Sequence, residues 1–405
     1  MRVKWVVVVG DGMADYPLSE LGGMTPLQAA DTPNMDFVSR GGVNGLLETV
    51  PEGVPPGSDV ANLSILGYDP ARCYTGRGPI EAAALGVELG EDETAFRCNL
   101  VTVEDGVMVD YSAGHISSGE ARELVEALNT RLGGGRVRFY SGVSYRNILV
   151  VQGDMSSVEC TPPHDITGRR VDDYLPRGAG AGFLLELMEE ARKVLERHPV
   201  NLDRARKGLK PANYIWPWGQ GGKPRLEGFR ERFGVRGAVI SAVDLVRGLG
   251  VLTGLTVINV PGATGYYDTN YSGKAEYALK ALEEGLDLVF IHVEAPDEAG
   301  HAGDVEAKIK AIEMIDGEVV GRILDRIGSL DEKYRVAVLA DHPTPIEVRT
   351  HTRDPVPVAV MSSGEEGDEV SEFDEFSARR GALGLLKGER FMELFIRRPL
   401  KACPR

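Results

Sequence analysis

Two segments in the second half of the chain combine Asp and His at spacings suited to metal binding. In "FIHVEAPDEAGHAGD", Asp297 and His301 stand four positions apart, so on a helix both side chains lie on one face and could reach one ion. In "VAVLADHPTP", Asp341 and His342 directly follow an apolar run, and His351 stands just before another. Imidazole and carboxylate ligands together suit Mn, Zn or a similar divalent ion. Each segment alone is weak evidence, but together they predict a metal centre.

A serine with two interpretations lies in "EGVPPGSDVANLSILG". Ser58 starts a helical pattern, where serine is a favoured N-cap. The same position meets the positive end of a helix dipole and free amide groups, which suit a phosphoryl group. A metal at its hydroxyl would favour the alkoxide and make Ser58 a nucleophile.

The segment "VVVVGDGMADYP" ends an apolar run at a turn that contains Asp11. A dinucleotide-binding fingerprint would need a third glycine where Asp15 stands, and Pro17 interrupts the helix that should follow. We therefore expect a buried strand that delivers the Asp11 carboxylate at its carboxyl end, where open α/β sheets place their sites.

Short apolar strands alternate with amphipathic helices over most of the chain, which predicts an α/β fold with a mostly parallel sheet covered by helices on both faces. The clearest expected strands are 5–9, 235–240, 256–260, 286–292, 335–340 and 356–360. The clearest expected helices are 183–196, 274–284, 305–327 and 382–396.

One stretch has a different order of elements. Residues 98–166 are expected to form two strands, a helix from Ser118 to Leu132, and two further strands. This order predicts a smaller α+β domain, inserted into a metal-binding catalytic domain made of residues 1–97 and 167–405.

The composition excludes several classes of partner. A formal net charge of -16 over 405 residues argues against sequence-independent binding to nucleic acid or to an anionic membrane. No apolar stretch reaches the length of a membrane-spanning helix. The four cysteines (Cys73, Cys98, Cys160 and Cys403) show no metal-ligand spacing, which fits a reducing cytoplasm. The sequence does not determine the oligomeric state, and a homo-oligomer is possible.

The order and context of Asp11, Ser58, Asp297/His301, Asp341-His342 and His351 resemble the alkaline phosphatase superfamily. The whole chain to about residue 360 is similar to the archaeal type of cofactor-independent phosphoglycerate mutase. The segments that carry this resemblance are "VVVVGDGMAD", "TPLQAADTPNMD", "PPGSDVANLSILGYDP", "YTGRGPIEAA", "PPHDITGRR", "AVISAVDLVRGLG", "VPGATGYYDTNYSGKA", "VEAPDEAGHAGD" and "DHPTP".

The resemblance implies two divalent metal ions, first of all Mn, with Zn, Co or Mg as alternatives. It assigns Asp11, Ser58, Asp341 and His342 to one ion, and Asp297, His301 and His351 to the other. Ser58 would take the phosphoryl group of 3-phosphoglycerate and return it to the other hydroxyl, giving 2-phosphoglycerate without added bisphosphoglycerate. The inserted domain is the expected lid that keeps water from the intermediate.

His115 in "YSAGHISSG" resembles the family histidine that handles the substrate hydroxyl proton, although it could also be an ordinary loop residue. Expected substrate-binding residues are Arg77, Arg146, His164, Asp165, Arg169 and Lys274. His198 and His292 are interpreted as ordinary residues of a helix end and a buried strand.

Two alternatives remain open at this point. One is a metal-dependent phosphomonoesterase or a phosphopentomutase on the same scaffold. The other, less favoured, is a metal-stabilised binding protein without turnover, in which Ser58 is only a cap.

Overall fold

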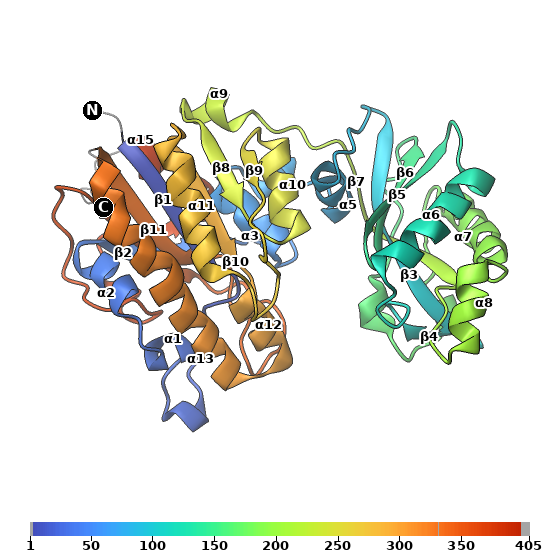
Figure 1. The fold of residues 1–405 in the computed structure, drawn as a ribbon, viewed down its shortest axis with the longest axis horizontal. Helices are drawn as coiled ribbons and strands as arrows, with labels where there is room; N and C mark the ends of the chain where they lie inside the picture. Colours follow the sequence, from blue (N-terminus) through green and yellow to red (C-terminus); the bar gives the residue numbers. More distant parts are fainter. Residues whose placement is uncertain (1–2, 331, 398–405) are drawn as a thin grey trace. The chain divides into compact units, whose positions relative to one another are not determined.

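The computed structural model describes residues 3–330 and 332–397, and Figure 1 shows their arrangement. The chain divides into two compact units. Unit 1 comprises residues 1–74 and 226–405, and unit 2 comprises residues 75–225.

Unit 1 is built on an eight-stranded sheet in which most neighbouring strands are parallel. Its middle strand is β1, which pairs in parallel with β10 on one side and β11 on the other. The run of valines in β1 is fully buried, as expected for a strand covered on both faces. In spatial order the strands are β13 (Gly384–Lys387), β2 (Gly42–Glu48), β12 (Val356–Ser362), β11 (Lys333–Ala340), β1 (Val3–Gly10), β10 (Leu288–Val293), β8 (Gly237–Ile240) and β9 (Thr256–Ile258).

Helices flank this sheet in two packed groups (Figure 1). One group contains α3 (Ser58–Ile65), α10 (Asp244–Leu252) and α15 (Gly388–Arg397). The other contains α2 (Pro33–Arg40), α11 (Tyr271–Glu283), α13 (Val305–Met314) and α14 (Arg322–Ile327). The remaining helices of unit 1 are α1 (Pro26–Ala29), α4 (Pro70–Cys73), α9 (Phe229–Phe233) and α12 (Ala295–Ala302).

Unit 2 is a five-stranded sheet with helices on both faces. Helices α6 and α7 cover one large apolar core, and α5 contributes to a second, smaller core formed with β3 and β6. The strands are β3 (Glu93–Glu104), β4 (Val107–Asp110), β5 (Val137–Val143), β6 (Arg146–Gln152) and β7 (Tyr214–Gly222). The helices are α5 (Arg77–Ala84), α6 (Ser118–Leu132), α7 (Ala181–Leu195) and α8 (Pro199–Arg206).

Unit 2 extends well beyond the inserted domain predicted at residues 98–166. The difference arises because β7 pairs antiparallel with β3, and helix α7 packs against both β7 and α6. Residues 167–225 therefore complete the core of unit 2. A strand reading "YIWPWGQGG" contains Pro and three Gly, which hides its strand character in the sequence.

Two predicted helices also differ in detail. The helix expected over 305–327 contains a π-helical segment, Ile315–Gly321, between α13 and α14. The helix expected over 382–396 begins only at Gly388, because Gly384–Lys387 pairs with β2 as strand β13.

None of the helices in the described part of the chain combines the length and apolar character that a bilayer crossing requires. Cys73, Cys98 and Cys160 are free thiols, and Cys403 lies outside the described residues.

Candidate metal centre

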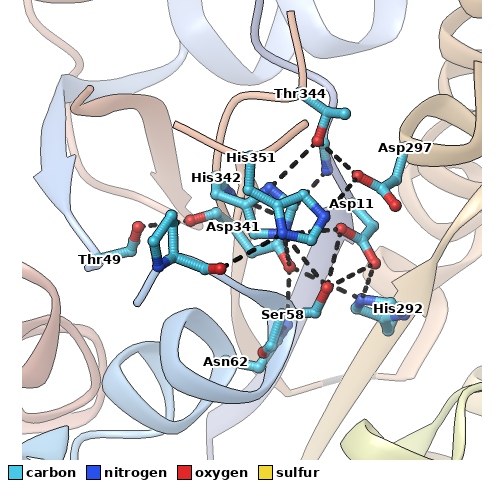
Figure 2. Close-up of polar contacts among 12 residues, drawn as sticks. Asp11, Thr49, Ser58, Asn62, His292, Asp297, Asp341, His342, Thr344 and His351 are labelled. Atoms are coloured by element: carbon cyan, nitrogen blue, oxygen red, sulfur yellow. Dashed lines mark hydrogen bonds and ion pairs between the residues drawn. The ribbon is translucent and has the colours of Figure 1, made fainter. Parts of the chain in front are cut away.

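Three neighbouring parallel strands end at one edge of the unit 1 sheet and bring most of the predicted ligands together (Figure 2). Gly10, the last residue of β1, pairs with Ala340 of β11 and Val293 of β10. The residues after these strand ends therefore meet. They are Asp11, the pair Asp341-His342, and helix α12 with Asp297.

The turn after β1 is shaped by contacts across the strands. The amide of Asp11 donates to the Val293 carbonyl at 2.9 Å, and the amide of Gly12 donates to Asp341 Oδ1 at 3.0 Å. Gly12 has φ +58°, and a Cβ there would lie 2.6 Å from Asp297 Oδ1. Glycine at this position therefore makes room for another predicted ligand, Asp297.

Ser58 is the first residue of α3, and the N-cap position belongs to Gly57. The interpretation of Ser58 as an N-cap is therefore wrong. Its Oγ lies 3.1 Å from His342 Nε2 and 3.3 Å from Asp11 Oδ2, at the centre of Figure 2. Helix α3 thus aims its N-terminus and its serine hydroxyl at the carboxylates.

A second group of ligand types lies beside the first. Asp297 Oδ2 lies 3.2 Å from His301 Nε2, one turn further along α12. His351, in the loop after β11, places Nε2 3.5 Å from Asp297 Oδ1 and 3.1 Å from His301 Nε2. Three donor atoms at such separations match the spacing of ligands around one ion of the size of Zn or Mn.

The tautomers of these imidazoles follow from their hydrogen bonds. His301 Nδ1 lies 3.0 Å from the Arg349 carbonyl, and His351 Nδ1 lies 3.4 Å from the Pro56 carbonyl. A carbonyl oxygen only accepts, so each Nδ1 carries the proton and each Nε2 keeps its lone pair for a cation.

His342 has the same tautomer for a less direct reason. Its Nδ1 lies 3.3 Å from Thr344 Oγ1. The Thr344 hydroxyl donates its own proton to Asp297 Oδ1, so its oxygen accepts from His342 Nδ1–H. The Nε2 lone pair of His342 consequently faces Asp11 and Ser58.

The charges in this site call for a cation. Burial raises the pKa of Asp11 well above its usual value, and the nearby charges of Asp341 and Asp297 raise it further. Burial acts in the same direction on Asp341, but His342 and His292 outweigh it and hold its pKa at about 2. Similarly, burial raises the pKa of Asp297, but His301 and His351 outweigh it and hold that pKa well below its usual range. Buried carboxylates with imidazole lone pairs fit divalent ions.

A buried ion pair supports the loops behind the ligands. Lys308 on α13 is fully buried and places Nζ 2.6 Å from Asp15 Oδ2, while it also donates to the carbonyls of Ala14 and Thr344. The amide of Asp15 donates to Glu375 Oε1 at 2.9 Å. Lys308 therefore ties the turn after Asp11 to the loop after His342.

Lys274, a predicted substrate cation, lies inside unit 1. It is buried on α11, and its Nζ donates to the His292 carbonyl at 2.8 Å. Burial lowers the pKa of Lys274 to about 8, although Glu294 opposes this effect. In this position Lys274 supports strand β10, and its role toward substrate stays a prediction.

The other predicted substrate residues lie in unit 2, and three of them lie close to three aromatic rings, as does His115. These rings belong to Tyr111, Tyr145 and Trp218. Arg77 and His164 lie 5.6 Å and 5.3 Å from the Trp218 ring. Arg146 and His115 lie 5.8 Å and 6.4 Å from the Tyr145 ring. His115 has φ +50°, an uncommon conformation for a residue with a side chain.

Asp165 and Arg169 are also exposed. Asp165 Oδ1 lies 3.6 Å from His164 Nε2, and Arg169 donates to the Tyr174 hydroxyl at 3.0 Å. Substrate contact by either residue stays a prediction.

Sequence analysis missed one further cation of unit 2. Arg97 on β3 is buried, pairs with Glu81 at 3.0 Å, and lies over the Trp218 ring at 4.9 Å. Burial lowers the pKa of Arg97, and the positive charges of Arg77 and Arg146 lower it further. The available signal was an arginine within the mostly apolar segment "TAFRCNLV".

Comparisons with known proteins agree with this architecture. Residues 39–201 match the family model described as 2,3-bisphosphoglycerate-independent phosphoglycerate mutase. A protein of that name from Methanothrix thermoacetophila is 57% identical over 394 residues, which are 97% of this chain and 100% of the relative.

Solved structures show the same similarity along the whole chain. A protein from Pyrococcus horikoshii has a TM-score of 0.84 and 32% identity, covering 100% of this chain and 99% of its own. A cofactor-independent phosphoglycerate mutase from Thermoplasma acidophilum has a TM-score of 0.67 and 31% identity, covering 98% and 99%.

The fold and the serine beside an Asp/His cluster are those of an α/β protein equipped for phosphoryl chemistry. The chain belongs to the 2,3-bisphosphoglycerate-independent phosphoglycerate mutase family, a family of isomerases. The predicted family and the predicted α/β fold class are confirmed.

Proposed function

We propose that the chain interconverts 3-phosphoglycerate and 2-phosphoglycerate through a phosphoserine at Ser58, without added bisphosphoglycerate. The observation that carries this proposal is the place of Ser58 Oγ, within 3.3 Å of both His342 Nε2 and Asp11 Oδ2 at the N-terminus of α3. A hydroxyl in that position can be deprotonated and can approach a phosphorus atom.

Two divalent ions are part of the proposal, with Mn as the first expectation. Asp11, Ser58, Asp341 and His342 would hold one ion, and Asp297, His301 and His351 the other. When bound, such ions neutralise phosphate charge and favour the ionised serine. The donor set supports this assignment, because the histidines assigned as ligands present Nε2 lone pairs to buried carboxylates.

The chain's own groups then carry the transfer. Ser58 Oγ, in the ionised form, attacks phosphorus, the bond from phosphorus to the O3 oxygen of the substrate breaks, and that oxygen takes a proton. We assign this proton transfer to His115, which gains a proton again when the second hydroxyl is deprotonated. Glycerate reorients, its O2 oxygen attacks the phosphoserine, and Ser58 is released.

The arginines of unit 2 support an anionic substrate. Arg77, Arg97 and Arg146 lie close enough for the charges of the other two to lower the pKa of Arg97, and Glu81 pairs with Arg97. Several guanidinium groups together favour a phosphate or carboxylate ligand. We assign unit 2 the role of binding the substrate and excluding water from the phosphoserine.

A phosphorus NMR time course tests the reaction. Metal-stripped protein is resupplied with Mn and given 3-phosphoglycerate alone. We expect the 2-phosphoglycerate resonance to grow to an equilibrium mixture with wild-type protein, and Ser58→Ala to abolish this growth. Ser64→Ala is the matched control, because Ser64 is a buried serine of the same helix whose hydroxyl has no hydrogen-bond partner among the described residues.

Other outcomes would overturn the proposal. Growth of free phosphate alone would show a phosphomonoesterase on the same site. Unchanged activity in Ser58→Ala would exclude the phosphoserine, and no turnover by the wild type would leave a binding protein.

A further inference from the structure

His292 is a buried histidine of the site that the proposed reaction does not use. It lies in β10 and its side chain is fully buried. Its Nε2 lies 3.1 Å from Asp11 Oδ2 and 3.9 Å from Asp341 Oδ2 (Figure 2). Neither contact is aligned as a hydrogen bond to that nitrogen. The Nε2 atom of His292 nevertheless faces both carboxylates of the proposed first ion.

The other ring nitrogen indicates which tautomer is present. His292 Nδ1 lies 3.3 Å from Ser241 Oγ, and that oxygen already accepts from the Val243 amide at 3.0 Å. Among the described residues, Nδ1 is the only acceptor within hydrogen-bond distance of the Ser241 hydroxyl proton, so Nδ1 accepts that proton. In the neutral ring Nε2 then carries the proton and faces the carboxylates as a donor.

This arrangement is opposite to that of the three histidines assigned as metal ligands. His301, His342 and His351 each carry the proton on Nδ1 and keep the Nε2 lone pair. Only a lone pair can bind a cation, so these three histidines are suited to bind an ion. His292 is suited instead to orient the ligand carboxylates.

The backbone fixes the imidazole from two sides. Strand β10 lies between β1 and β8, and residue Ile291 pairs with Ile240, so His292 and Ser241 follow adjacent in register. The His292 carbonyl accepts from Lys274 Nζ at 2.8 Å. Ser241, His292 and Asp11 thus form a buried row across the ends of three consecutive strands.

We propose that His292 is a positioning residue that presents Nε2–H to the carboxylate pair Asp11 and Asp341, at 3.1 Å and 3.9 Å, and so fixes which of their oxygens face the first ion. Asp11 Oδ1, the oxygen turned toward His342 at 3.3 Å, is left for that ion. This inference rests on the proposed first ion, and it predicts an effect on metal affinity that is independent of turnover.

Two amides that differ by one methylene test the inference. In His292→Gln the amide nitrogen reaches about as far as Nε2, whereas in His292→Asn it stops near the position of Nδ1. Mn titrations of the metal-stripped full chain, with free Mn counted by electron paramagnetic resonance, give affinity and stoichiometry. We expect Asn to weaken the tighter of the two Mn sites by about 10-fold to 100-fold, and Gln to stay within about 3-fold of wild type.

Ser241→Ala gives an independent test that keeps the imidazole. Without the Ser241 hydroxyl, Nδ1 no longer has a defined donor, and we expect a smaller loss of Mn affinity than in His292→Asn. Thermal unfolding of the metal-free proteins shows that each variant is folded. If His292→Asn does not fold, the comparison of Ser241→Ala with wild type decides, and unchanged affinity there overturns the inference.

Three further results would also overturn it. Equal affinity in wild type, Gln and Asn would make His292 a core residue only. Equal weakening in both amides would show that the shape of the imidazole matters and its donor does not. Three Mn ions in wild type and two in both variants would make His292 a ligand of a third ion. Absence of Mn binding by the wild type would instead defeat the proposed metal centre itself.

Discussion

The metal centre has two groups of ligands that differ in their surroundings. The inner group, Asp11, Asp341 and His342, is fully buried. In the outer group, Asp297, His301 and His351, the side chains of the two histidines are 36% and 18% exposed. The inner group stands directly on strand ends, whereas the outer group depends on helix α12 and on the loop that carries His351.

This difference implies that the two proposed ions are held by different kinds of support. The inner ligands are fixed by sheet hydrogen bonds and by buried neighbours, such as Asn62 Nδ2, which donates to Asp341 Oδ2 at 2.8 Å. The outer ligands depend on a loop in which Arg349 has φ +58° and accepts from His301. We therefore expect the outer ion to exchange faster and to be the easier one to replace.

Loss of an inner carboxylate should have the largest effect. Asp11→Asn removes one charge from a buried cluster, and we expect mutase activity to fall on the order of 10³-fold, the scale of losing one group that stabilises transition-state charge. Rates from the phosphorus NMR assay, at saturating Mn, provide the measurement. Asp325→Asn, at an exposed position of α14, is the control and should leave the rate unchanged. A loss below tenfold in Asp11→Asn would contradict the assignment of Asp11 as a ligand.

The support behind the inner group should be required for stability. Lys308→Met leaves Asp15 buried without its charged partner, and we expect a loss of about 3–5 kcal/mol in the free energy of unfolding. Urea unfolding of the metal-free protein measures it. Lys310→Met lies on the same helix, at an exposed lysine paired with Glu313, and should cost less than about 1 kcal/mol. Equal effects at the two lysines would show that the buried pair has no special role.

Glu375, which accepts from Asp15 and Thr25, should make this support depend on pH. Burial raises the pKa of Glu375 to about 7. Between the unfolded value near 4.5 and about 7, the folded protein holds a proton that the unfolded chain has lost, so this group's contribution to stability falls as pH rises.

The size of this effect is at most about 3 kcal/mol, since one pKa unit corresponds to about 1.4 kcal/mol. Glu375→Gln removes the titration, so its stability relative to wild type should improve from pH 5 to pH 8. Urea unfolding of both metal-free proteins at the two pH values measures the change, and a difference independent of pH would contradict it.

The smallest effect should separate the two ligand groups directly. In His301→Gly, added imidazole can enter from solvent, and we expect about a tenfold recovery of the lost activity. In His342→Gly the position is fully buried, and imidazole should restore nothing. Activity titrations with imidazole give the result, and N-methylimidazole provides a bulkier comparison. Equal rescue of both variants would contradict the difference in exposure.

Much of the fold could be predicted from the sequence where the pattern is local. The buried strand at residues 5–9 is found as β1, and five other expected strands are found within a few residues of their predicted ends. The short strand β13 and the Pro-containing strand β7 were missed, because their strand character depends on distant partners, β2 and β3. The boundaries of unit 2 could not be predicted for the same reason.

Most of the ligand types could be predicted because they stand at a strand end or on one helical face, and His351 because it lies shortly before an apolar run. The residues that support these ligands could not be predicted from the sequence. His292 has the pattern of an ordinary core residue, and only the pairing of β10 with β1 brings it to Asp11. Lys308 lies on an amphipathic helix among exposed lysines and glutamates, and nothing local distinguishes it from Lys310.

The central position of β1 has a consequence for protein synthesis. A ribosome delivers Trp5 long before its partners, Leu288 of β10 and Arg335 of β11. Unit 2 is continuous in the chain, so its core can form during synthesis while β1 is still unpaired. Such an apolar, unpaired strand is prone to aggregation, and nascent chains emerge at about 5–20 residues per second. Strand β1 can therefore pair with β10 and β11 only after most of the chain has emerged.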